Sequence, residues 1–136
     1  VGQLLTCWDP KALVSSPWTR CIETMTPFVR ITNRRIKHKN SITEASAKDK
    51  PHKARNTFVK LLESSRSIAV CTHRPVLPFL LEATERFLDV KYAPALSNAL
   101  PATDPYLKPG AIIVSHQAPG RDSKIVAVEV YDAFED

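Results

Sequence analysis

The chain has 136 residues, of which 43% are hydrophobic and 24% are charged. A chain of this length buries roughly two thirds of its unfolded surface, so we expect one compact domain that needs neither a disulfide nor a metal. The three cysteines form no Cys-x-x-Cys pair, which argues against a zinc site and favours a reducing cytoplasm. The chain has only three glycines, too few and too far apart for a Gly-rich nucleotide-binding loop of the Rossmann or P-loop type. No apolar run approaches the roughly 20 residues that span a bilayer, so no membrane partner is expected.

The net charge of +5 is concentrated in one part of the chain. Between Arg30 and Lys60 there are ten basic residues and only two acidic ones. Such a cluster can attract nucleic acid or a phosphorylated small molecule, or it can form a solvated face that keeps a small domain in solution. No aromatic residue lies between Val29 and Thr57, which argues against stacking on single-stranded nucleic acid. A nucleic-acid partner is therefore not expected.

The predicted elements alternate between helices and strands along the chain. In order they are the end of a helix over 1–6, a strand over 12–15, a helix from Ser16-Pro17 to about Met25, a strand over 28–36, a polar connection over 40–51, a helix over 52–63, a strand over 67–72, a helix over 76–88, an ordered loop over 91–109, and a hairpin of 111–115 and 124–131 with its turn at 119–122. This order predicts an α/β fold in three layers, with a mostly parallel sheet, helices on both faces and a C-terminal β-hairpin.

Two of the predicted parallel strands end in polar segments, Ser15–Arg20 and Thr72–Pro75. Ligands of such sheets bind at the carboxyl ends of the strands, and helix N-termini favour anions. Arg20 could form a bidentate fork with a phosphate, and His73 could donate a hydrogen bond or move a proton near neutral pH. The alternative is that Ser16 is an ordinary helix cap, Arg20 a surface arginine and His73 a loop histidine.

Three segments of the chain also resemble a known family. The segment over 13–24 (LVSSPWTRCIET) is similar to the SSPxxRxxxT signature of the histidine phosphatase, or phosphoglycerate-mutase-like, superfamily. The segment over 69–78 (AVCTHRPVLP) resembles the second-histidine segment, in the form found in the C-terminal domain of actinobacterial MutT-type proteins with an N-terminal Nudix domain. The segment over 41–44 (SITE) resembles the short stretch that often supplies an acidic residue.

The resemblance implies roles for three residues. An arginine at the position of Arg20 clamps the phosphoryl group in this family, and a histidine at the position of His73 hydrogen-bonds it and stabilises the transferring charge. A carboxylic acid near the position of Glu44 would protonate the leaving oxygen, although Glu44 fits a surface carboxylate equally well. The family's chemistry requires no metal and no cofactor. The implied partner is a phosphorylated small molecule or a nucleotide.

The sequence departs from the family at its beginning. Histidine phosphatases begin with a central strand that ends in Arg-His-Gly, whose histidine is the nucleophile. This chain contains no Arg-His-Gly and no Nudix box, and it starts at Val1 with its only methionine at position 25. We therefore expect residues 1–136 to form an N-terminally truncated histidine-phosphatase-like domain of a longer protein.

These observations leave two functional hypotheses open. In the first, the chain is part of a hydrolase that acts on phosphate esters of nucleotides or small metabolites, and is inactive by itself because it lacks the nucleophilic histidine. In the second, it is a non-catalytic module that binds phosphate or forms a homodimer and regulates a fused Nudix enzyme. Both hypotheses place a phosphate near Arg20 and His73.

Overall fold

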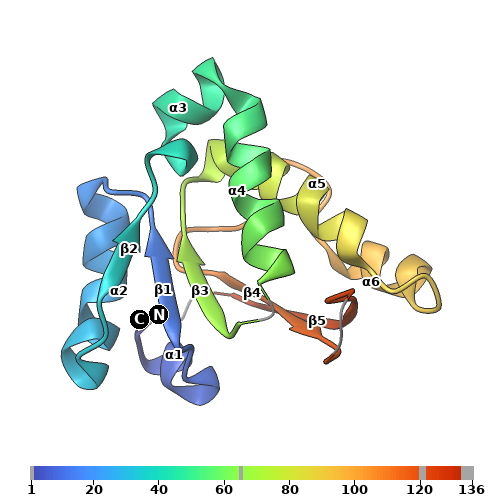
Figure 1. Cartoon of the computed structure of the whole chain (residues 1–136), viewed down its shortest axis with the longest axis horizontal. Coiled ribbons are helices and arrows are strands. Elements are labelled where there is room, and N and C mark those ends of the chain that lie inside the picture. Colours follow the sequence, from blue (N-terminus) through green and yellow to red (C-terminus); the bar gives the residue numbers. More distant parts are fainter. Residues whose placement is uncertain (1, 65, 120–121, 133–136) are drawn as a thin grey trace.

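The computed structural model describes residues 2–64, 66–119 and 122–132 (Figure 1). Its helices and strands are α1 (Gly2–Trp8), β1 (Ala12–Ser15), α2 (Thr19–Thr32), β2 (Ile36–His38), α3 (Glu44–Asp49), α4 (Pro51–Glu63), β3 (Ile68–Cys71), α5 (Leu77–Phe87), α6 (Ala93–Ala99), β4 (Ile112–Gln117) and β5 (Ile125–Tyr131), with single 3₁₀ turns η1 (Asn40–Ile42) and η2 (Arg74–Val76). This mixture of helices, a small parallel sheet and a final antiparallel hairpin confirms the predicted α/β class. None of the described helices has the length and apolar character needed to cross a membrane.

The parallel sheet has three strands in the order β2-β1-β3. Ser15, at the end of β1, lies opposite His38 on one side and Cys71 on the other. The carboxyl ends of all three strands therefore meet at one edge of the sheet, where the predicted polar segments begin. The resemblance implied a further central strand, but β1 and β3 pair directly, so this sheet is continuous without it.

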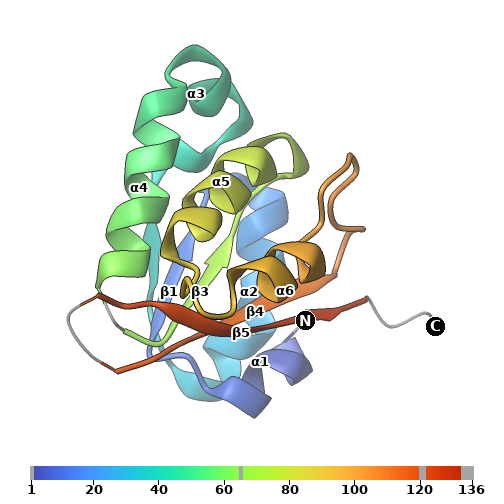
Figure 2. The same ribbon diagram turned by 90° about the vertical axis from the view of Figure 1, so that its right-hand side faces the viewer.

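Helices cover both faces of this sheet, as predicted (Figure 2). Successive side chains of β1 point to opposite faces because the side-chain period of a strand is two. Leu13 packs with Met25 and Phe28 on the side of α1 and α2. Val14 packs with Phe58 on the side of α3 and α4. Each layer thus has its own apolar core, and the sheet lies between them.

The hairpin forms a separate two-stranded antiparallel sheet. Ile125 of β5 is fully buried. It packs with Leu81 of α5, with Leu88 directly after α5, and with Leu96 of α6. This third cluster attaches the hairpin to the helical layer. The two strands of the hairpin were predicted correctly. Residues 120–121 of the predicted turn over 119–122 lie outside the described residues. Val1 of the predicted first helix also lies outside them.

The second helix differs from its prediction. It was expected to end near Met25 before a strand over 28–36, but α2 continues through Pro27 to Thr32, and the next strand, β2, has only three residues. Pro27 is exposed, while Met25 and Phe28 are buried in the core below the helix. The spacing of Cys21, Met25 and Phe28 is the i, i+4, i+7 pattern of one helical face, and this packing outweighs the missing proline N–H.

Two further helices were predicted as irregular segments. The polar connection over 40–51 contains η1 and α3, and the loop over 91–109 contains α6. Both helices are short, at six and seven residues, so they depend on tertiary contacts rather than on intrinsic propensity. Ala47 and Leu96 provide those contacts by packing into two different clusters.

Candidate functional site

The loop between β1 and α2 is held to the end of β3. Ser16 is fully buried, and its backbone N–H donates to the carbonyl of Cys71 at 3.0 Å. The hydroxyl of Ser16 accepts from the backbone N–H of Trp18 at 3.3 Å. Ser16 was predicted to cap a helix that starts at Pro17, but α2 begins at Thr19, and the hydroxyl instead orders the loop before it. This start places Arg20 in the first turn of α2.

His73 follows β3 and forms the floor of the site. Its side chain is only 5% exposed. The Nε2 atom lies 2.8 Å from the hydroxyl oxygen of Ser16, which makes a buried hydrogen bond between the two strand ends. The indole of Trp18 lies against the imidazole, with ring centroids 4.8 Å apart and planes tilted by 54°. These contacts fix the orientation of the histidine ring.

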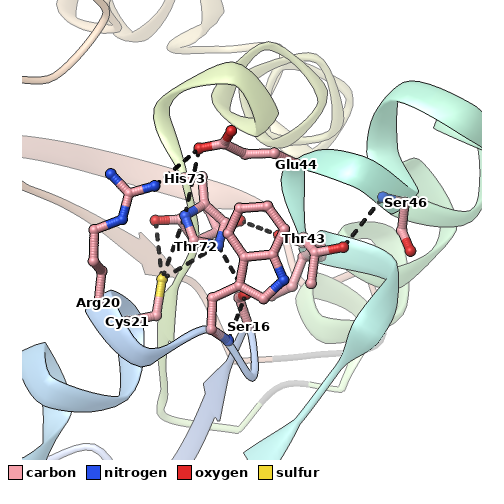
Figure 3. A network of polar contacts seen from close by, with 10 residues as sticks. Ser16, Arg20, Cys21, Thr43, Glu44, Ser46, Thr72 and His73 are labelled. Atoms are coloured by element: carbon pink, nitrogen blue, oxygen red, sulfur yellow. Dashed lines mark hydrogen bonds and ion pairs between the residues drawn. The ribbon is translucent and has the colours of Figure 1, made fainter.

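Glu44 bridges the other two predicted residues (Figure 3). Its Oε1 atom lies 3.5 Å from Nη2 of Arg20 and 3.8 Å from Nδ1 of His73. The three residues come from α2, α3 and the end of β3, so the fold brings together all the residues predicted for the site. The side chains of Arg20 and Glu44 are 76% and 35% exposed, so the site opens to solvent above the buried histidine.

The position of Glu44 is set by the residues next to it. The hydroxyl of Thr43 accepts from the backbone N–H of Ser46 at 3.1 Å and so caps α3. The hydroxyl of Thr72 donates to the carbonyl of Ile42 at 2.7 Å. The start of α3 is thereby tied to the residue before His73, which explains why Glu44 and His73 lie close together.

Burial determines the protonation of His73. Burial is the largest cause that lowers the pKa of His73 below its ordinary value of 6.5. The carboxylate of Glu44 raises this pKa, and the guanidinium of Arg20 lowers it further. His73 is therefore neutral at neutral pH, with one ring nitrogen available as an acceptor and the other as a donor. Neutral His73 leaves Arg20 and Glu44 as the only charges among these three residues.

The lowered pKa of His73 predicts a pH dependence of stability. Because the unfolded chain binds a proton more readily, the contribution of His73 to the free energy of unfolding is fully present above pH 6.5 and is lost as the pH falls through its folded pKa. The pKa values of Asp9 and Glu129 are also lowered, but these carboxyl groups change the free energy of unfolding only below about pH 4.5, which is a separate pH range. We expect urea denaturation to show this loss just below pH 6.5 and His73→Gln to remove it. An NMR titration that places the pKa of His73 above 6.5 would contradict the assignment.

Two residues of this site were not predicted. Trp18 covers the histidine ring, and the sulfur of Cys21 lies 3.7 Å from Nε2 and 3.9 Å from Nδ1 of the same ring. The thiol of Cys21 also donates to the carbonyl of Thr72 at 3.5 Å. The one sequence signal was that Trp18 and Cys21 flank Arg20 within the segment resembling the phosphatase signature.

Three lysines of the basic cluster over 30–60 lie away from this site. Lys39, Lys53 and Lys60 line a hollow beside α4 that includes none of the three predicted site residues. In the described part of the chain, no group of three His, Cys, Asp or Glu residues could hold a metal ion. The chemistry available around His73 is therefore that of a guanidinium, a carboxylate, a neutral imidazole, a hydroxyl and a thiol.

The sequence was compared with protein-family models and with curated proteins. No protein-family model matches the chain. No curated protein matches it either.

Proposed function

We propose that the chain carries the phosphate-binding site of a phosphohydrolase that acts on phosphate esters of nucleotides or small metabolites, similar to a histidine phosphatase. The observation that supports this most is the convergence of Arg20, Glu44 and His73 at the carboxyl end of the parallel sheet. Ligands of α/β sheets bind at this edge. An arginine beside a buried imidazole donor is suited to the oxygens of a phosphoryl group.

Each residue has a distinct role in the proposal. Arg20 places its guanidinium on two phosphoryl oxygens, and the positive end of the α2 dipole adds to this attraction. His73 donates a hydrogen bond to a third oxygen, with Ser16 holding the ring in place at 2.8 Å. Glu44, whose carboxyl group is partly exposed, protonates the leaving oxygen of the ester.

The net charge of the site makes phosphate binding depend on pH. Arg20 and Glu44 balance one another at 3.5 Å, and His73 is neutral at neutral pH. A phosphate dianion therefore brings two uncompensated charges into the site. In the proposal, binding takes up a proton at His73, whose pKa burial lowers in the empty site, and the affinity for the phosphate dianion rises as the pH falls toward 6.5.

The nucleophile is the part that this sequence does not supply. No Arg-His-Gly occurs in it, and His38 lines a different hollow, on the α2 side of β2. The proposal therefore assigns phosphate binding to these 136 residues and the nucleophilic histidine to another segment or chain. The same observation favours the second candidate function, a non-catalytic phosphate-binding or dimerisation module that regulates a fused Nudix enzyme.

One experiment compares this chain with a version extended at its N-terminus. Each is assayed for binding of inorganic phosphate by calorimetry and for hydrolysis of p-nitrophenyl phosphate. We expect both to bind phosphate, only the extended protein to hydrolyse the ester, and Arg20→Ala and His73→Gln to abolish that hydrolysis. Undiminished turnover in the two variants would overturn the proposed site. Phosphate binding without turnover in either protein would favour the regulatory module.

A further inference from the structure

The hollow beside α4 has a volume of about 310 Å³ and has no role in the proposed chemistry. Its charged residues are all cations: Lys39, which follows β2, and Lys53 and Lys60 of α4. Among the described residues, no carboxylate lines it. In the part of the chain that the structure describes, none of these three lysines forms an ion pair. The hollow therefore gathers three positive charges that no acidic side chain compensates.

Both walls of the hollow, η1 and α4, are held in place by the packing behind them. The fully buried Ile42 of η1 packs with Ala54 and Phe58 of α4. Nearer the surface, the hydroxyl groups of Ser41 and Thr57 form a hydrogen bond across the same interface, and both residues line the hollow. The hollow is thus formed before a ligand binds, so little binding free energy is lost in ordering its walls.

The positive charges are spread along α4 and do not meet at one point. Lys53 and Lys60 are two helical turns apart, so they share one face of α4 and are separated by about 10 Å along its axis. Asn56 lies between them on this face, and its side-chain amide adds a further donor. A ligand that binds both lysines therefore has to be an extended chain of acceptors and not a compact ion.

The number of charges also favours a chain of phosphates. A single phosphate group carries a charge of about −1.5 to −2 at neutral pH, so it leaves at least one of the three lysines uncompensated. Two or three linked phosphate groups carry enough charge for all of them. Lysine ammonium groups only donate hydrogen bonds, which suits phosphoryl oxygens, and no aromatic side chain among the described residues lines the hollow to stack on a nucleobase. The lining thus fits a phosphate chain and not a base.

We propose that the hollow beside α4 is a second anion site that binds an oligophosphate chain, either free or as part of a nucleoside triphosphate. Lys53 and Lys60 bind phosphate groups at the two ends of the chain, and Lys39 binds it from the side of β2. The site binds its ligand without breaking a bond. This inference does not rest on the proposed function at Arg20 and His73, because its readout is binding at the three lysines.

The test is a titration of the chain with tripolyphosphate, measured by calorimetry and by NMR of the lysine side chains. We expect the resonances of Lys39, Lys53 and Lys60 to shift along one saturating curve, whereas inorganic phosphate leaves them in place. Arg20→Ala should not change these shifts, because Arg20 does not line the hollow. Adenosine triphosphate should shift the same resonances. If it binds more tightly than tripolyphosphate, the chain comes from a nucleotide, and equal or weaker binding indicates a free oligophosphate.

Variants that remove one charge each separate a site from attraction by net charge. Lys53→Gln and Lys60→Gln should each weaken tripolyphosphate binding about tenfold, the loss of roughly one hydrogen bond to a charged group. Lys48→Gln removes the same charge at an exposed position in the last turn of α3, outside the hollow, and should leave the affinity unchanged. Equal losses in all three variants would overturn the proposal. Lysine resonances that neither oligophosphate moves, or that a single-stranded oligonucleotide moves at a lower concentration, would overturn it as well.

Discussion

Arg20→Ala is expected to weaken the binding of inorganic phosphate about 10- to 100-fold. Hydrogen bonds to charged groups contribute about 1.5–3 kcal/mol, and each 1.4 kcal/mol is roughly tenfold in affinity. The substitution removes both hydrogen bonds of the guanidinium fork. Only His73 and the helix dipole then hold the anion. Calorimetry with inorganic phosphate measures the loss directly. Arg20→Lys keeps the charge without the fork, so its affinity should fall between those of the other two proteins.

The same substitution should leave the fold intact. The Arg20 side chain is 76% exposed, and its ion pair with the partly exposed Glu44 lies open to solvent and contributes only about 0–1 kcal/mol. A matched control is Arg30→Ala, because Arg30 is an exposed arginine in the last turn of the same helix. We expect Arg30→Ala to leave phosphate affinity unchanged. Equal losses in the two variants would indicate attraction by net charge and not a site at Arg20.

Phe58→Ala is expected to lower the free energy of unfolding by about 3–5 kcal/mol. Phe58 is 1% exposed and packs against Val14 of the sheet and Val76 before α5. Its removal leaves a cavity at the centre of the layer that also holds Ile42, next to the site. Domains are stable by about 5–15 kcal/mol, so this loss is a large fraction of the total. Urea denaturation followed by circular dichroism measures it.

Two controls accompany this prediction. Lys60→Ala changes an exposed position of the same helix and should alter stability by less than about 0.5 kcal/mol. Phe58→Leu fills most of the cavity and should lose clearly less than Phe58→Ala. A loss below about 1 kcal/mol for Phe58→Ala would mean that α4 does not pack on the sheet as described.

The fold could be predicted where packing follows a local pattern. The apolar spacing of Ala54, Phe58, Leu61 and Leu62 gave α4, and the short apolar run over 68–71 gave β3. The extent of α2 could not be predicted because Pro27 is a local signal to stop. The helix continues because Phe28 enters a core assembled from distant parts of the chain. The short helix α3 depends likewise on contacts of Ala47 that no local pattern reveals.

The candidate site shows the same division. Arg20 and His73 could be placed because each follows a predicted strand, and the ends of parallel strands share one edge of the sheet. Glu44 was suggested by a family resemblance. Its place beside Arg20 and His73 depends on the helix cap at Thr43 and on the hydrogen bond from the Thr72 hydroxyl to the Ile42 carbonyl. The contact of Cys21 with His73 could not be predicted. It depends on the packing of α2 against β3, which brings the sulfur of Cys21 to the carbonyl of Thr72, next to His73.

A titration of the chain with inorganic phosphate, followed by NMR at labelled side chains, tests the proposed site most directly. We expect the resonances of the Arg20 guanidinium and the His73 ring to shift along one saturating curve, and those of Lys39, Lys53 and Lys60 to keep their positions. Saturating shifts confined to the three lysines, with His73 unmoved, would contradict it and place the anion in the hollow beside α4.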